Sequence, residues 1–191
     1  MKSALTVLVA LVVVALAAPT AHANESIWGD LRSQDGLVIL YRHAIAPGGG
    51  DPPGFRLGDC STQRNLSGEG RQQARAIGRE LRQERVPVAQ VRSSRWCRAL
   101  DTARLMAVGS VRPTPALDSV FTASTVRALK QERRTKSLIR QHRGKTGALV
   151  LVGHQANIID LTGIAPSSGE GVVVRMGDDG RLEVLGRIPA P

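Results

Sequence analysis

The chain has 191 residues, enough for one domain with a substantial hydrophobic core. Lys and Arg number 26 against 16 Asp and Glu, so the formal net charge is +10. Such a charge suits a nucleic acid, an anionic membrane surface or an anionic small molecule as partner. Only 3% of the residues are aromatic, which leaves few rings to stack on bases, so the composition argues against nucleic acid.

Residues 1–23 have the pattern of a cleavable secretory signal peptide. A basic residue, Lys2, precedes an apolar stretch over residues 4–18, and Ala21-His22-Ala23 has the small-x-small pattern of a cleavage site. The apolar stretch is shorter than the roughly 20 residues that a membrane span needs. We therefore expect cleavage after Ala23, a periplasmic or secreted location, and a mature domain of residues 24–191 with no stable membrane span.

Beyond the leader, apolar strands alternate with amphipathic helices. A short amphipathic segment at 27–32 leads into the first strand. The expected strands cover residues 37–41, 88–94 and 147–153, and a hairpin covers 171–188 with its turn at 178–180. The expected helices cover residues 65–86 with Ser67 as N-cap, 95–108 with Gly109 as the stop, and 122–143.

This alternation predicts an α/β fold, a three-layer sandwich with a mainly parallel central sheet. Two of the strands are continuously apolar, which is typical of strands covered on both faces by helices. Ligands of such sheets bind outside the carboxyl ends of the strands. Arg42, His43 and His154 directly follow apolar strands. We therefore expect these three side chains to face one crevice.

Histidines and arginines in one crevice favour the chemistry of a phosphoryl group. Two histidines without a third ligand make a poor metal site, and neighbouring arginines repel a cation. Arginine forks match phosphate oxygens, and a neutral imidazole can attack phosphorus and carry the phosphoryl group covalently. Neighbouring positive charges lower the pKa of that imidazole and so keep its lone pair available.

Four motifs, in family order, make the chain similar to the histidine phosphatase (phosphoglycerate mutase-like) superfamily. "LVILYRHA" resembles the family's R-H-G signature, although Ala44 stands where the family usually has Gly. "LSGEGRQQA", "VRSSRWCRALDTA" and "LVLVGHQANI" resemble its L-T-x-x-G-x-x-Q-A, S-x-x-x-R-A-x-x-T-A and second-histidine segments. The resemblance looks closest to exported bacterial members, such as lipopolysaccharide core heptose phosphatase-like proteins.

The resemblance implies a phosphatase that hydrolyses phosphomonoesters through a phosphohistidine. By position, His43 would be the nucleophile, Arg42 and Arg98 would bind phosphate, and His154 would be the second histidine at the phosphate. It implies no metal or organic cofactor. Two alternatives stay open: a catalytically weak phosphate- or glycan-binding envelope protein, and a phosphatase that acts on phosphohistidine, a phosphoramidate.

The carboxylic acid that protonates the leaving group is not settled by the sequence. Asp118 lies where many members of the superfamily place this acid, and it is slightly favoured. Asp51, in the loop after His43, is the position that a smaller subgroup uses, and Glu170 is a third candidate.

Three further features lie outside the four motifs. Cys60 and Cys97 are the two cysteines, and in an oxidising compartment they are expected to form a disulfide. Arg64 is expected to be solvated, with phosphate contact as the alternative. The basic helix from 127 to 143 is expected to present a solvated face, with an anionic lipid or glycan surface as the alternative partner. The expected substrate is a small phosphorylated molecule, such as an envelope sugar phosphate, and the oligomeric state is left open.

Overall fold

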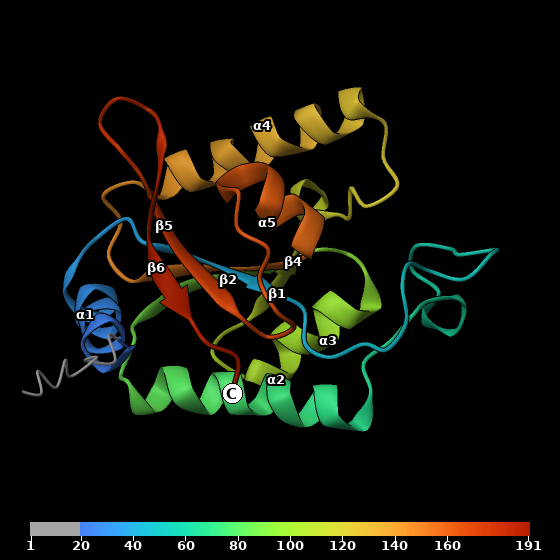
Figure 1. The fold of residues 1–191 in the computed structure, drawn as a ribbon, viewed down its shortest axis with the longest axis horizontal. Helices are drawn as coiled ribbons and strands as arrows, with labels where there is room; N and C mark the ends of the chain where they lie inside the picture. The colour runs from blue at the N-terminus through green and yellow to red at the C-terminus, as the bar shows by residue number, and fades with distance from the viewer. Residues whose placement is uncertain (1–19) are drawn as a thin grey trace, which may run out of the picture.

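The computed structural model describes residues 20–191 (Figure 1). The expected signal peptide lies outside the described residues, apart from residues 20–23, which belong to the first described helix, α1 (Thr20–Ser33). In the described part of the chain, no helix is both long and apolar enough to cross a membrane.

Six strands form one mixed sheet in the order β3-β2-β4-β1-β5-β6. Their bounds are β1 Val38–Arg42, β2 Val88–Ser93, β3 Val111–Pro113, β4 Ala148–Gly153, β5 Gly171–Met176 and β6 Leu182–Ile188. The first four strands in this order run parallel to one another, whereas β5 pairs antiparallel with β1 and β6 antiparallel with β5. The predicted α/β fold with a mainly parallel sheet is confirmed, and so is the predicted hairpin.

Helices cover both faces of the sheet, as Figure 1 shows. Helices α2 (Gly68–Gln83) and α3 (Cys97–Met106) lie on one face, while α4 (Thr125–His142) and α5 (Gln155–Thr162) lie on the other. Strand β1 alternates between the two cores: Ile39 and Tyr41 belong to the first, Val38 and Leu40 to the second. A strand buried on both faces reads as a continuous apolar run, which explains the sequence pattern.

The start of α2 is set by its N-cap residue, and its position against the chain after β1 is set by one glycine. The Ser67 hydroxyl accepts a hydrogen bond from the Gly70 amide at 2.9 Å, as expected of an N-cap. A Cβ atom at Gly70 would lie 2.0 Å from the carbonyl oxygen of Ile45. Only glycine therefore lets α2 pack this closely against the segment that follows β1.

The helix that contains Arg98 ends earlier than expected. It stops at Met106, and Ala107 takes the left-handed conformation at its C-cap with φ 51°. Gly109, the predicted stop, lies two residues further on. The Arg82 side chain of α2 donates to the carbonyl oxygens of Met106 and Ala107 at 2.9 and 3.1 Å. These bonds help to hold a non-glycine residue in a conformation that helix ends usually assign to glycine.

Candidate active site

The two histidines meet because β1 and β4 are parallel neighbours in the sheet. Their register sets Arg42 opposite Gly153, so the next residues, His43 and His154, leave the sheet side by side. The His43 amide donates to the carbonyl oxygen of Gly153 at 2.9 Å. The two imidazole centroids are 5.5 Å apart. The sheet thus brings both predicted histidines to one crevice at its carboxyl edge.

The ring of His43 is oriented for nucleophilic attack. Its Nδ1 lies 2.8 Å from the carbonyl oxygen of Ala44. Because a carbonyl oxygen only accepts, Nδ1 carries the proton, and Nε2 of the neutral ring keeps its lone pair. Burial is the main cause that lowers the pKa of His43 to about 3; the bond to Ala44 opposes it, and the charges of Arg98, Arg64 and Arg42 act with it. The ring is therefore neutral at physiological pH.

His154 is held by a residue that the sequence analysis missed. Its Nε2 lies 2.8 Å from the hydroxyl of Ser94, and both side chains are buried. Burial lowers the pKa of His154 well below its usual value, and His43 and the nearby arginines act in the same direction. Ser94 is the serine of the S-x-x-x-R-A-x-x-T-A motif. The motif specifies this serine as well as the predicted phosphate-binding arginine, so it could have identified Ser94 as a site residue.

Three arginines surround the histidines. Arg98 is only 3% exposed, and Arg42 and Arg64 are partly buried. The Nε atoms of Arg42 and Arg98 are buried and have no hydrogen-bond partner among the described residues. An unpaired buried donor costs about 1–3 kcal/mol, so these groups are suited to an added acceptor such as a phosphate oxygen.

The expectation that Arg64 is solvated is wrong. Its Nε donates to the carbonyl oxygen of Gly50 at 2.9 Å, and a second nitrogen donates to that of Ala46. Gly50 has φ 78°, a left-handed conformation that lets the loop curl over the guanidinium. Arg64 therefore lies in the wall of the crevice.

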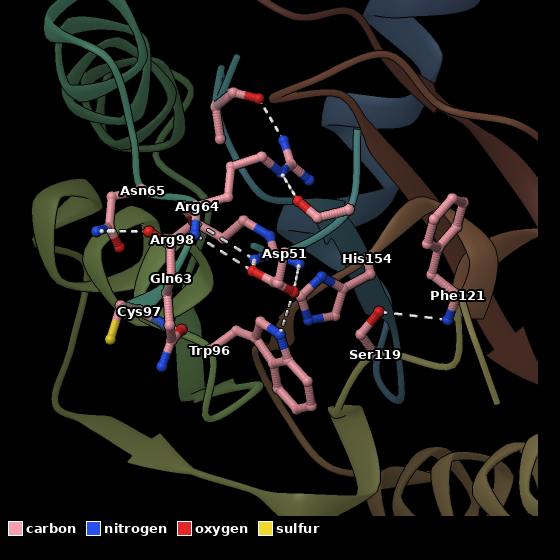
Figure 2. A network of polar contacts seen from close by, with 12 residues as sticks. Asp51, Gln63, Arg64, Asn65, Trp96, Cys97, Arg98, Ser119, Phe121 and His154 are labelled. Carbon is pink, nitrogen blue, oxygen red and sulfur yellow. Dashed lines mark hydrogen bonds and ion pairs between the residues drawn. The ribbon is translucent and has the colours of Figure 1, made fainter. Parts of the chain in front are cut away.

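Asp51 forms an ion pair with the most buried of these cations, Arg98. Its carboxylate accepts from Arg98 at 2.6 and 3.2 Å and from the Trp96 indole at 2.9 Å. Figure 2 shows the carboxylate between these two side chains. Burial alone would raise the pKa of Asp51, but the hydrogen bonds from Arg98 and Trp96 outweigh burial and lower it. Asp51 is thus an ionised carboxylate where an anionic ligand would meet Arg98.

The structure does not bring Asp118 or Glu170 to the crevice. Both side chains are buried, but Asp118 binds the guanidinium and backbone amide of Arg95, and Glu170 binds Arg187. The next residue, Ser119, does line the crevice. Of the three candidate acids, all among the described residues, only Asp51 lines the cavity together with the two histidines.

Other motif residues form hydrogen bonds with the segment that follows β1. The Ala44 amide donates to the Thr102 hydroxyl at 3.0 Å, and that hydroxyl donates to the Arg98 carbonyl oxygen at 2.7 Å. The Gln73 side chain accepts from the Ile45 amide at 3.1 Å. Ala44 is not among the described residues with a positive φ, so alanine fits without strain where the family pattern has glycine.

The predicted disulfide between Cys60 and Cys97 is confirmed, with 5.7 Å between their Cα atoms. Cys97 is the first residue of α3 and precedes Arg98. Its backbone amide donates to the Gln63 side chain at 3.0 Å. The disulfide thus fixes the loop that contains Asp51 and Arg64 to the helix that contains Arg98.

The crevice opens into a cavity of about 880 Å³. Its floor is made of the histidines and arginines, and its walls include the stacked rings of Phe55 and Trp96, whose centroids are 5.2 Å apart. The N-terminus of α5 follows His154 directly and also lines the cavity. Free amides at a helix N-terminus favour anions. A neutral imidazole, three arginines and a helix N-terminus can together bind a phosphoryl group and attack it.

Comparisons with known proteins agree with this chemistry. Residues 38–120 match the family model of the Histidine phosphatase superfamily (branch 1). The sequence has no significant match among curated proteins.

Several solved structures share the fold. The structure of the protein histidine phosphatase SixA complexed with tungstate has a TM-score of 0.56 at 15% identity, covering 81% of this chain and 97% of its own. An Entamoeba histolytica phosphoserine phosphatase in complex with 3-phosphoglyceric acid has a TM-score of 0.60 at 14% identity, covering 79% and 95%. An open reading frame product from Mycobacterium tuberculosis has a TM-score of 0.61 at 16% identity, covering 78% and 94%. At these identities the likeness establishes a common fold.

Proposed function

We propose, from the match of residues 38–120 to the model of the Histidine phosphatase superfamily (branch 1), that the chain is an exported phosphatase that hydrolyses phosphomonoesters through a phosphohistidine at His43. The observation that carries this proposal is the hydrogen bond from His43 Nδ1 to the Ala44 carbonyl oxygen, which leaves Nε2 as a nucleophile among three arginines.

In the first step, Nε2 of His43 attacks phosphorus and the bond to the ester oxygen breaks. Arg42, Arg98 and Arg64 neutralise the phosphoryl oxygens, whose charge is the main obstacle to attack. The neutral ring of His154 can take up a proton once a dianion lies beside it, because an adjacent negative charge favours the imidazolium.

Asp51 is the proposed proton donor to the leaving oxygen. In the free protein it pairs with Arg98, which the phosphate also needs. Displacement of Asp51 by the phosphate removes the hydrogen bonds that lower its pKa. Burial and the adjacent dianion then raise that pKa, and the carboxyl takes a proton from solvent. Substrate binding therefore prepares the acid.

In the second step, water attacks the phosphorus of phospho-His43 and the P–N bond breaks. The Asp51 carboxylate, left ionised by the first step, takes the proton from that water. Inorganic phosphate leaves, the Asp51 carboxyl releases this proton to solvent, and its carboxylate pairs with Arg98 again. The proton first taken from solvent is thus returned to it at the end of the cycle.

A phosphorylated envelope sugar is the proposed substrate. The stacked pair Phe55–Trp96 offers a flat apolar wall of the kind that can cover a sugar ring. The location follows from the proposed signal peptide, residues 1–23, which would deliver the mature domain of residues 24–191 to the periplasm or the medium. The disulfide is consistent with an oxidising compartment.

Phosphoramidate hydrolysis is the second candidate, favoured by the ionised state of Asp51. The leaving nitrogen of a phosphohistidine can be protonated by solvent before the P–N bond breaks, so this substrate does not require a buried acid. One protein of the same fold is described as a protein histidine phosphatase.

The test compares turnover of p-nitrophenyl phosphate by the wild type and by His43→Ala. We expect an active wild type and a loss of about 10⁴-fold or more in the variant, as for removal of other catalytic nucleophiles. His142→Ala, which removes a histidine outside the cavity, is the control. A wild type that binds phosphate without turnover would identify a binding protein and contradict the proposal.

A further inference from the structure

Exposed apolar side chains gather where the cavity opens. Of the described residues, the large apolar side chains that are exposed include Phe121 (68%), Val126 (76%), Leu129 (48%) and Ile159 (39%). Phe121 and Ile159 line the cavity, and Val126 and Leu129 lie in the first turns of α4, just after the lining segment. Water-exposed apolar groups at one place mark a binding surface.

Helix α4 extends this surface away from the cavity. Its inner face consists of the buried residues Gln131, Thr135, Ile139 and His142. The outer face, on the other side of the 3.6-residue period, begins with Val126 and Leu129 and continues with basic residues. Apolar and basic side chains therefore share the solvent-facing side of one helix.

Most basic residues of this helix form no ion pair with another described residue. In the part of the chain that the structure describes, five of them form no ion pair: Arg127, Lys130, Arg133, Arg134 and Arg140. Lys136 pairs with Glu132, which is the single acidic residue of the helix. Arg127 also lines the cavity. Such unpaired cations beside the opening attract an anionic partner.

We propose that the mouth surface, made of Phe121, Val126 and Leu129 with Arg127, Lys130 and Arg133, docks on an anionic lipid layer. Apolar side chains that enter the acyl boundary, flanked by Lys and Arg at the headgroups, are the arrangement that binds proteins to such layers. An apolar protein partner would account for the first set of side chains but not for the second. The basic residues beside the apolar ones therefore favour an anionic lipid layer as the partner.

Docking in this orientation turns the cavity toward the layer. Helix α1 lies at the end of the molecule away from the mouth (Figure 1), so the bulk of the domain would stay in water. A phosphomonoester held in the layer would then enter the cavity past Arg127 without leaving the surface. This last consequence rests on the proposed phosphatase function, whereas the docking itself does not.

A matched pair of tryptophan variants tests the docking. Val126→Trp lies on the mouth surface, and Val184→Trp places the same change at an exposed valine on β6. The native Trp28 and Trp96 are buried and give a constant background that the wild type measures. The vesicles contain equal parts phosphatidylglycerol and phosphatidylcholine, with brominated chains as the quencher.

We expect a blue shift and quenching at position 126 and neither at position 184. The signal is local, so attachment through another part of the chain does not produce it. Absence of quenching at position 126, or equal quenching at both positions, would overturn the proposal. Hydrolysis of p-nitrophenyl phosphate is measured separately, so loss of turnover and loss of docking are distinguishable.

A charge variant tests the second half of the surface. Lys130→Gln with Arg133→Gln is expected to weaken binding to these vesicles about tenfold or more, since each cation near an anionic surface contributes about 1 kcal/mol. Arg75→Gln with Arg79→Gln removes the same charge from α2, on the opposite face of the sheet, and is expected to bind as the wild type. Equal weakening by both pairs would mean that net charge alone acts and would overturn the assignment to the mouth surface.

Discussion

At the floor of the cavity, the side chains that would meet a phosphate are buried and fixed by short polar contacts. His43, Ser94, Arg98 and His154 are each less than 5% exposed. The rim is different: it consists of the loop at residues 47–62 and the segment at 118–127, and it exposes Phe121, Val126 and other apolar groups. The floor can position reacting atoms because it is rigid, whereas the rim is free to differ in what it recognises.

Asp51 is the point where the two regions meet. It belongs to the rim loop, but its carboxylate binds Arg98 of the floor. The contrast therefore predicts that changes at the floor abolish turnover of every substrate, while changes at the rim alter stability, acid function or choice of substrate.

Arg98→Ala should have the largest effect. We expect a loss of about 10²–10³-fold in kcat for p-nitrophenyl phosphate, because a fixed charge on the transferring group is lost from a buried site. The control is Arg95→Ala, three residues earlier, whose guanidinium is partly exposed and bound to Asp118. Steady-state kinetics of both variants measure the difference. Similar losses in the two would show that Arg98 has no special place at the phosphate.

Breaking the disulfide should affect the rim more than the floor. Cys60→Ser with Cys97→Ser removes a cross-link over a sequence separation of 37 residues, and we expect unfolding to become easier by about 2–4 kcal/mol. Chemical denaturation measures this loss. Turnover of p-nitrophenyl phosphate by the folded fraction should change only a few-fold, because the sheet holds both histidines. A complete loss of turnover in the folded fraction would mean that the floor depends on the loop.

Asp51→Asn should separate substrates by their leaving groups. We expect a loss of about 10²-fold in kcat for an alkyl phosphate, which needs a proton donor, and little change for p-nitrophenyl phosphate. Phosphate should also bind more tightly, because no carboxylate competes for Arg98. Asp118 binds Arg95 and does not line the cavity. Asp118→Asn should therefore show no such dependence on the leaving group. The reverse pattern would return the acid role to Asp118.

The stability of the fold should fall at acid pH because His43 is buried. Its pKa is about 3 in the folded protein, against an ordinary value of 6.5. Between these values the unfolded chain binds a proton that the folded protein does not. The free energy of unfolding therefore falls as the pH falls, by up to about 1.4 kcal/mol per pH unit for this one group. Denaturation at a series of pH values should show a smaller slope for His43→Gln than for the wild type. Equal slopes would mean that His43 is already protonated in the fold.

Most of the floor could be predicted from the sequence. The ends of apolar strands place Arg42, His43 and His154 at one edge of a parallel sheet, and this placement does not depend on the orientation of their side chains. Arg98 lies in a motif, and the motif also contained Ser94 and Thr102, although only the structure shows that they hold His154 and Ala44.

The rim could not be predicted in the same way. Asp118 and Ser119 are neighbours in sequence, yet only Ser119 lines the cavity, and Asp118 turns to Arg95. No periodic pattern sets the direction of a side chain in an irregular loop, so sequence order could not decide between Asp118 and Asp51. The position of Arg64 could not be predicted for the same reason, since its partners are carbonyl oxygens of a loop that curls back over it.

In the proposed mechanism, His43 carries the phosphoryl group. The most direct measurement is rapid quenching of the enzyme during turnover, followed by peptide mass spectrometry under alkaline conditions that preserve phosphohistidine. We expect one phosphoryl group on the peptide that contains His43, and none in His43→Ala. A phosphoryl group on His154 or another residue, or a phosphoenzyme that persists in the variant, would contradict it.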